Sequence, residues 1–419
     1  ILQKDLNMIN QGTYNNPLVG AYIFPRGGDW DAVRMYERYD VTRRLSTQYW
    51  PIGDAGMTMQ NPYWIVNRMQ TENKKQRYML NASLKWDITD WFNVVGRVRV
   101  DNTTQDSYNR RYASTVGTFT EGSANGFYGH AKQNDYATYA DVIANISKNW
   151  ENWSLHVNVG GSIDDRSSNS AYINGGLNKV ANFFHYGNIN KDLSKRNETS
   201  WHQQIQSVFA SGAIGWNKML YLTVTARNDW SSTLPIGNNS FFYPGATLSW
   251  IFSNQFIEED DIFSFGKLRM AYGMTGTDAS QYYTSTSFTQ ASAGGYYTSV
   301  VDFPMNGTNA FQTSSTMGST NSKPEMTSEF EVGLNLQFFK GRLGLDAAYY
   351  HRTTSDQIFT LPVDPSSGYS YMVTNFGEVR NQGIELLLNT TPIQTKNFRW
   401  DLDFNFAINK NKVLSMPES

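Results

Sequence analysis

The feature that most constrains this chain is a long alternation of apolar and polar residues that recurs in pairs of segments. In one segment the residues Trp153, Leu155, Val157, Val159 and Ile163 fall on one face of an extended strand, and polar residues fall on the other. A period of two over about ten residues is typical of a strand that crosses a bilayer at a tilt. One apolar face and one polar face, repeated many times, leave few architectures open.

The alternation becomes regular near Arg77 and forms six pairs of strands, each pair joined by a short turn. The pairs lie at 77–101, 136–164, 202–229, 246–274, 329–349 and 383–409. Long polar loops are expected near 103–135, 165–200, 230–240, 277–325 and 355–378. Short turns that alternate with long loops are characteristic of outer-membrane barrels. We therefore predict an all-β fold, a transmembrane antiparallel β-barrel with about twelve strands in 77–419. Residues 1–76 are expected to hold one barrel strand and a long extracellular loop.

Composition narrows the alternatives. The mean hydropathy is −0.51, and no run approaches the roughly 18 apolar residues that a membrane-spanning helix needs. The net charge of −2 gives no basic face for nucleic acid. Cysteine is absent, which excludes a disulfide framework and thiolate metal sites.

The polar faces of the predicted strands carry charge at mid-strand, as the wall of a wet lumen would. The residues expected to face this lumen are Arg97, Arg99, Glu329, Glu331, Asp401 and Asp403. A soluble β-sandwich also alternates apolar and polar positions. Against it stand strands longer than the usual five or six residues, and tryptophans such as Trp86, Trp153 and Trp400 beside the short turns, where an interfacial girdle would place them.

Signals for catalysis are weak. The five histidines (130, 156, 185, 202 and 351) are far apart and lack metal-ligand spacing. The acidic run at 258–261 lacks the alternating oxygen ligands of a calcium loop, which favours a solvated turn. No nucleophile elbow is present. We predict that the chain is not an enzyme and has no catalytic residue, metal site or cofactor.

Aromatic residues gather in the predicted loops among Ser, Thr, Gly and Asn. The candidate substrate contacts are Tyr63, Trp64, Tyr282, Tyr283, Tyr296, Tyr297, Phe303, Tyr369 and Tyr371. Such side chains can stack on sugar faces or grip a peptide. They can equally pack a loop against its neighbours, and both interpretations stay open.

Short motifs along the chain resemble one family when they are taken in order. They are NPYW at 61–64, RNDWSS at 227–232, FYP at 242–244, LRMAYG at 268–273, KPE at 323–325, EFEVG at 329–333 and NFGEVRNQGIE at 375–385. Together they resemble SusC/RagA-type transporters, the TonB-dependent nutrient importers of Bacteroidetes outer membranes.

The resemblance implies a 22-stranded barrel with an N-terminal plug and a segment that contacts TonB. It also implies a SusD-like surface lipoprotein as partner, import of oligosaccharides or peptides, and an assembly in which transporter–lipoprotein pairs dimerise. The chain starts without a signal peptide and shows neither plug nor TonB box, so we expect it to be the barrel portion of a longer protein. A passive porin and a surface glycan-binding β protein are the alternatives.

Overall fold

A computed structural model describes residues 2–6, 16–53, 59–256, 262–293, 301–303, 305 and 307–416. Residues 1–80, 99–138 and 166–202 form one compact unit, and residues 81–98, 139–165 and 203–419 form a second. The five strands β4 to β8 each contribute one stretch to either unit.

Twelve long strands carry the fold, in the six pairs that the alternation predicts. They are β4 (Met69–Thr89), β5 (Phe92–Tyr112), β6 (Gly126–Asn149), β7 (Trp153–Gly176), β8 (Lys195–Trp216), β9 (Leu220–Ser231), β10 (Ser240–Trp250), β11 (Phe263–Thr277), β17 (Glu325–Phe338), β18 (Leu343–Ser355), β21 (Glu378–Gln394) and β22 (Arg399–Ser415). Hydrogen bonds join each strand to the next in this order. The prediction of about twelve antiparallel strands in hairpins is confirmed.

The short turns close as their residues require. Between β8 and β9 the Met219 N–H donates to the Trp216 carbonyl at 2.9 Å. The two central residues, Asn217 and Lys218, have positive φ angles of 50° and 53°. This is the turn whose twist matches that of the flanking strands, and Asn is one of the residues that tolerate it.

The predicted loop at 103–135 is wrong, because β5 continues to Tyr112 and β6 begins at Gly126. The loop predicted at 165–200 is likewise shortened by β7 and β8 to the residues between Gly176 and Lys195. These strand ends carry polar residues on both faces, so no alternation marks them. Besides the backbone ladder, polar side chains join them across strands, as in the Arg110–Glu72 ion pair and the Thr104–Asn134 hydrogen bond.

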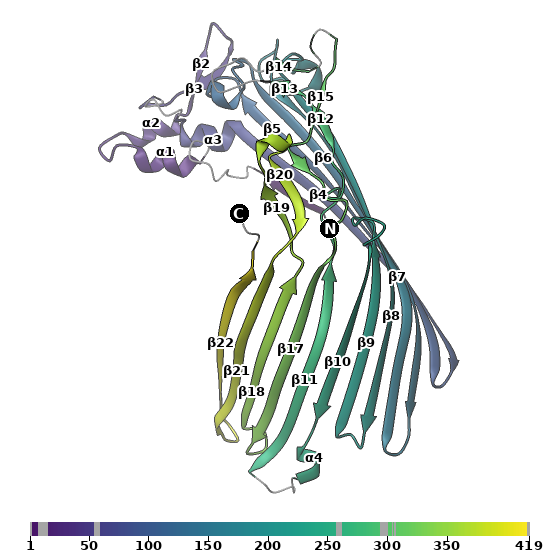
Figure 1. The fold of residues 1–419 in the computed structure, drawn as a ribbon. Coiled ribbons are helices and arrows are strands. Elements are labelled where there is room, and N and C mark those ends of the chain that lie inside the picture. The colour runs from purple at the N-terminus through teal and green to yellow at the C-terminus, as the bar shows by residue number, and fades with distance from the viewer. Residues whose placement is uncertain are drawn as a thin grey trace. The chain divides into compact units, whose positions relative to one another are not determined.

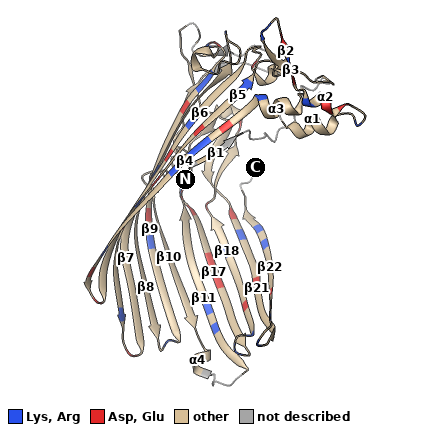
Figure 2. Ribbon diagram, turned by 180° about the vertical axis from the view of Figure 1, so that it is seen from behind, with Lys and Arg blue, Asp and Glu red and all other residues tan. Residues whose placement is uncertain are grey.

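The second unit has one apolar face and one polar face. Cross-strand pairing from β8 to β22 aligns a single row of apolar side chains: Ile214, Leu222, Leu248, Met270, Val332, Tyr349, Ile384 and Ile408. All of these except Val332 are 38–56% exposed. We call this side of the sheet the apolar face and the opposite side the polar face. Figure 1 shows strands β9, β10, β11, β17, β18, β21 and β22 side by side, and Figure 2 shows charged residues along several of them.

Small elements between the long strands complete the second unit. They are α4 (Ser253–Phe256), β12 (Phe288–Gln290), β13 (Ser292–Ala293), β14 (Val301–Asp302), β15 (Phe311–Thr313), β16 (Thr316–Met317), β19 (Ile358–Pro362), η3 (Pro365–Ser367) and β20 (Tyr371–Asn375). Strand β20 pairs with both β16 and β19, which joins the two longest loops. Leu234, Phe241 and Ala279 form a buried cluster beside them.

The first unit begins with β1 (Leu2–Leu6), which pairs antiparallel with residues 72–76 of β4. The segment that follows is not an irregular loop. It contains α1 (Pro17–Ile23), α2 (Trp30–Arg34), β2 (Glu37–Asp40), β3 (Leu45–Gln48) and α3 (Pro62–Arg68), and η1 (Gly117–Phe119) and η2 (Tyr186–Asn188) lie further along the unit.

Asn61 is the central polar residue of this segment, and its side chain is completely buried. Its Nδ2 group donates to the carbonyls of Val33 (2.7 Å) and Tyr49 (2.9 Å), and its Oδ1 atom accepts from the N–H of Tyr63 (2.8 Å) as the N-cap of α3. One buried amide therefore ties three parts of the segment together. The guanidinium of Arg68 donates two hydrogen bonds to the Glu37 carboxylate, which raises the pKa of Arg68.

No helix in the described parts of the chain is both long and apolar enough to span a membrane.

Candidate functional site

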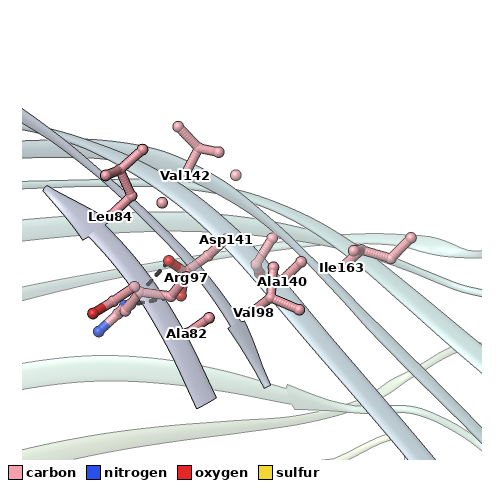
Figure 3. A pocket seen from close by; sticks show the side chains of 12 residues that line it. Ala82, Leu84, Arg97, Val98, Ala140, Asp141, Val142 and Ile163 are labelled. Carbon is pink, nitrogen blue, oxygen red and sulfur yellow. Dashed lines mark hydrogen bonds and ion pairs between the residues drawn. The ribbon is translucent and has the colours of Figure 1, made fainter. Parts of the chain in front are cut away.

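The polar face of the second unit is organised by ion pairs between neighbouring strands. Arg97 of β5 donates from Nε and Nη2 to the two carboxylate oxygens of Asp141 on β6, at 3.0 and 2.8 Å (Figure 3). The Asp141 side chain is fully buried, whereas half of the Arg97 side chain is exposed. A two-pronged pair of this kind fixes the direction of the guanidinium as well as its charge.

Arg269 makes the most extensive of these contacts, and the sequence did not single out its role. Its two terminal nitrogens donate to Asp346 on β18 at 3.0 and 2.9 Å, and its Nε donates to Glu331 on β17 at 3.2 Å. Asn335 donates to the same Asp346 carboxylate at 2.8 Å. The side chain starts on β11 and ends at β18, so it crosses the whole width of β17.

A glycine makes this crossing possible. Gly333 pairs with Arg269 across β11 and β17. A Cβ atom at Gly333 would lie 2.8 Å from the Arg269 Cγ and closer still to the guanidinium. Only a residue without a side chain lets the arginine lie flat against the strand. The Gly333–Arg269 pair is therefore a single structural unit, which we call the arginine crossing.

The other residues predicted to face the lumen are distributed as follows. Glu329 and Glu331 lie on the polar face, where Arg352 donates to Glu329 at 2.6 Å. Asp403 accepts from Asn389 at 2.6 Å on the same face. Asp401 lies past a register shift and accepts from Thr391 at 2.6 Å. Arg99 is exposed and belongs to the first unit.

Trp64 was predicted to contact substrate, and the structure contradicts this. Its side chain has no exposed surface, and its indole N–H donates to the Thr115 hydroxyl at 3.0 Å. The apolar ring fills the core of the first unit, where its one donor is satisfied. Tyr63, its neighbour on α3, is half-buried, and its ring lies 6.2 Å from that of Trp30.

The remaining candidate aromatics belong to the second unit. Tyr282, Tyr283 and Tyr371 are 60%, 39% and 45% exposed, and Phe303 and Tyr369 are half-buried. Tyr296, Tyr297 and the acidic run at 258–261 lie outside the described residues. No ring contact joins any two of the described candidates, so they do not form one stacked platform.

Polar contacts tie the loops that carry these aromatics to one another. Asn375 accepts from the Lys323 N–H and donates to the Lys323 carbonyl, both at 2.7 Å. At the base of the 277–325 loop, the Asp278 carboxylate accepts from Gln203 (2.7 Å), Ser231 (2.5 Å) and Thr233 (3.0 Å). Asp278 was not predicted as an anchor, because its partners are distant in the sequence.

A shallow hollow of about 550 Å³ lies over β4 to β7 in the second unit. Small residues (Ala82, Gly96, Ala140 and Gly161) line it together with Leu84, Val98, Val142 and Ile163 (Figure 3). The other residues that line it are Ser83, Ser162 and the Arg97–Asp141 ion pair. Among the described residues, no group of three or more His, Asp or Glu side chains is placed to hold a metal ion.

Comparison with known proteins gives consistent matches. A family model described as "TonB dependent receptor-like, beta-barrel" matches residues 7–413. TonB-dependent receptor P3 of Formosa agariphila is 26% identical over 374 residues, which cover 88% of this chain and 36% of the relative. TonB-dependent receptor SusC of Bacteroides thetaiotaomicron is 25% identical over 393 residues, with 88% of this chain and 37% of the relative covered.

The fold also matches a solved structure, that of the RagAB peptide transporter. The TM-score is 0.73 at 20% identity, and the match covers 85% of this chain and 38% of that one. At this identity the likeness concerns the fold alone. The chain thus spans a little over a third of the length of the proteins that it matches.

Proposed function

This chain belongs to the TonB-dependent receptor-like β-barrel family, a family of outer-membrane receptors rather than enzymes, and on that premise we propose that it forms barrel wall of a nutrient importer. The importer would take up oligosaccharides or peptides across the outer membrane of a Gram-negative bacterium of the Bacteroidetes. A SusD-like surface lipoprotein and TonB would be its partners, as the SusC/RagA resemblance implies, and transporter–lipoprotein pairs would dimerise.

The observation that carries this proposal is the two-sided sheet of the second unit. A row of apolar side chains crosses eight strands, and all of them except Val332 are exposed, while ion pairs occupy the opposite face. In water such an apolar surface would be costly, at roughly 25 cal/mol for each Å². Facing lipid it is stabilising, and the polar face is then left to line a hydrated interior.

The polar face and the loop aromatics would have different roles in import. Arg97, Arg99, Glu329, Glu331, Asp401 and Asp403 would keep the interior wet and offer polar contacts to whatever fills it. The exposed Tyr282, Tyr283 and Tyr371, with Tyr63, Tyr369 and Phe303 nearer their loop cores, would meet substrate at the outer surface. Loops that are joined through Asn375 and anchored at Asp278 can present such side chains in fixed positions.

The test compares a strain that carries the intact receptor with a strain that lacks it, and with one that lacks TonB. Each strain grows on a defined mixture of maltooligosaccharides and casein peptides, and mass spectrometry follows depletion of each component. We expect one solute class to be depleted only when receptor and TonB are both present. Depletion without TonB would favour a passive porin, and recovery of the receptor in the soluble fraction would favour a glycan-binding β protein.

A further inference from the structure

A second hollow, of about 560 Å³, lies on the polar face over β9, β10, β11, β17, β18 and Asn381 of β21. Gly245 pairs with Gly273, and Gly273 pairs with Glu329, so the two glycines share the face of that carboxylate. Ala271, paired with Glu331, extends the same floor. A Cβ atom added at Gly273 would meet nothing within 4 Å. The floor at Gly273 is therefore bare backbone with free space above it, whereas a Cβ at Gly245 would lie 2.7 Å from the Thr225 hydroxyl oxygen. We call this hollow the polar recess.

Hydroxyl groups surround the floor. Thr225 and Thr247 line one side of the polar recess, and Thr275, Thr327 and Thr354 line another. Each hydroxyl has two acceptor lone pairs as well as one donor. Tyr272 also borders the hollow, but it pairs with Phe330 on the apolar face. The recess thus offers oxygen acceptors and, among its lining residues, no aromatic floor on which a sugar ring could stack.

The charges at the rim do not balance. Arg352 is bound to Glu329, whereas Glu331 receives its bond from Arg269, whose terminal nitrogens are both bonded to Asp346. Three carboxylates thus share two guanidinium groups. On the same face Arg227 is paired with Asp229, while Lys267 and Glu385, of opposite charge, lie outside the recess. The surplus charge is negative, and Glu331 is the carboxylate held by the longest bond.

We propose that the polar recess binds the ammonium group of an amine-bearing solute, such as a peptide N-terminus or a lysine side chain. An ammonium group has three donors and no acceptor, which matches the Glu331 carboxylate together with threonine oxygens. The inference deepens the proposed function, on which it rests, because it makes the polar face a contact site for cationic solutes and gives Glu331 the anchoring role.

The experiment measures binding of trilysine to the intact receptor in detergent micelles by calorimetry, with maltotriose as an uncharged probe. Glu331→Gln removes the surplus charge, and Gly273→Val fills the floor without a backbone clash. Glu385→Gln, a carboxylate on the same face outside the recess, is the matched control. We expect Glu331→Gln and Gly273→Val each to weaken trilysine binding about tenfold or more, the size of one lost charged hydrogen bond. Glu385→Gln should bind like the parent, and added salt should weaken the parent complex.

Equal trilysine affinity in the parent and both recess variants would overturn the proposal, as would the absence of trilysine binding by the parent. Thermal melts of the variants establish that each has folded. The outcome is separable from that of the import test. If the receptor depletes a solute in a TonB-dependent way but its trilysine affinity does not change in Glu331→Gln, only the recess proposal is rejected. If trilysine binding depends on Glu331 but no solute is depleted in a TonB-dependent way, the proposed transport function is rejected instead.

Discussion

Replacement of Gly333 by alanine tests whether the arginine crossing stabilises the sheet. The new Cβ would occupy the space of the Arg269 side chain, which would have to leave its position over β17. Arginine is flexible and can move, but the move breaks its bonds to Asp346 and Glu331. The substitution therefore removes the crossing without deleting any of its charged groups.

The expected magnitude follows from the exposure of the three partners. A hydrogen bond to a charged group is worth about 1.5–3 kcal/mol when well buried. The side chains of Arg269 and Asp346 are each 29% exposed and that of Glu331 is 35% exposed, so solvent screens the pair. We expect the loss of all three bonds to cost about 1–2 kcal/mol after this discount.

A second effect of Gly→Ala opposes this loss of stability, so the sign of the measured change is informative. Gly→Ala at an unstrained position stabilises a protein by about 0.4–1 kcal/mol, because the unfolded chain has less freedom to lose. Gly273→Ala is the matched control, since it lies on the neighbouring strand and same face with free space around it. It should stabilise the receptor, whereas Gly333→Ala should destabilise it.

The assay is denaturant unfolding of the intact receptor in lipid vesicles, followed by tryptophan fluorescence. In an Arg269→Ala background Gly333→Ala should stabilise the receptor as Gly273→Ala does, because no guanidinium is then displaced. If Gly333→Ala stabilises the receptor as much as Gly273→Ala does, the arginine crossing contributes nothing and the reasoning is refuted.

Three further substitutions probe other parts of the account. Leu334→Arg places a charge on the apolar face and should destabilise the receptor by about 2–4 kcal/mol at the bilayer midplane. Gel-mobility shifts should then show a lower heat stability, and unchanged stability would contradict the assignment of Leu334 to the lipid side. Thr115→Val leaves the buried Trp64 N–H without its acceptor, which should cost about 1–3 kcal/mol and perturb the near-UV circular dichroism; an unaltered spectrum and melt would count against it. Asp278→Asn weakens the hydrogen bond that the Asp278 carboxylate accepts from the Ser231 hydroxyl. Limited proteolysis should then cut the adjoining loops faster, and cleavage at the parental rate would contradict the anchoring role.

Much of the fold could be predicted from the sequence because lipid and water impose opposite demands on successive residues. That pressure acts only on the part of each strand within the bilayer. Beyond the bilayer, both faces of β5 and β6 carry polar residues, so the alternation that would reveal a strand is lost. The helices α1 to α3 were missed for another reason, since each has five to seven residues and too few turns to show a helical period.

The candidate sites show the limit of residue type as a guide. Trp64 and Tyr63 are adjacent, yet one is completely buried and the other is not, and only packing decides between them. The arginine crossing depends on which residues of β11, β17 and β18 stand opposite one another. Register of this kind is set by pairing across the sheet, so Arg269 and Gly333 could not be linked from spacing alone.

The most direct test of the central claim is a nitroxide scan of positions 328–336 along β17 in the intact receptor, reconstituted in lipid vesicles. Collision with oxygen reports lipid, and collision with a nickel chelate reports water. We expect oxygen accessibility to peak at 330, 332 and 334, and nickel accessibility to peak at the positions between them. Low accessibility to both reagents at 330, 332 and 334 would place these side chains in a protein core and contradict the account.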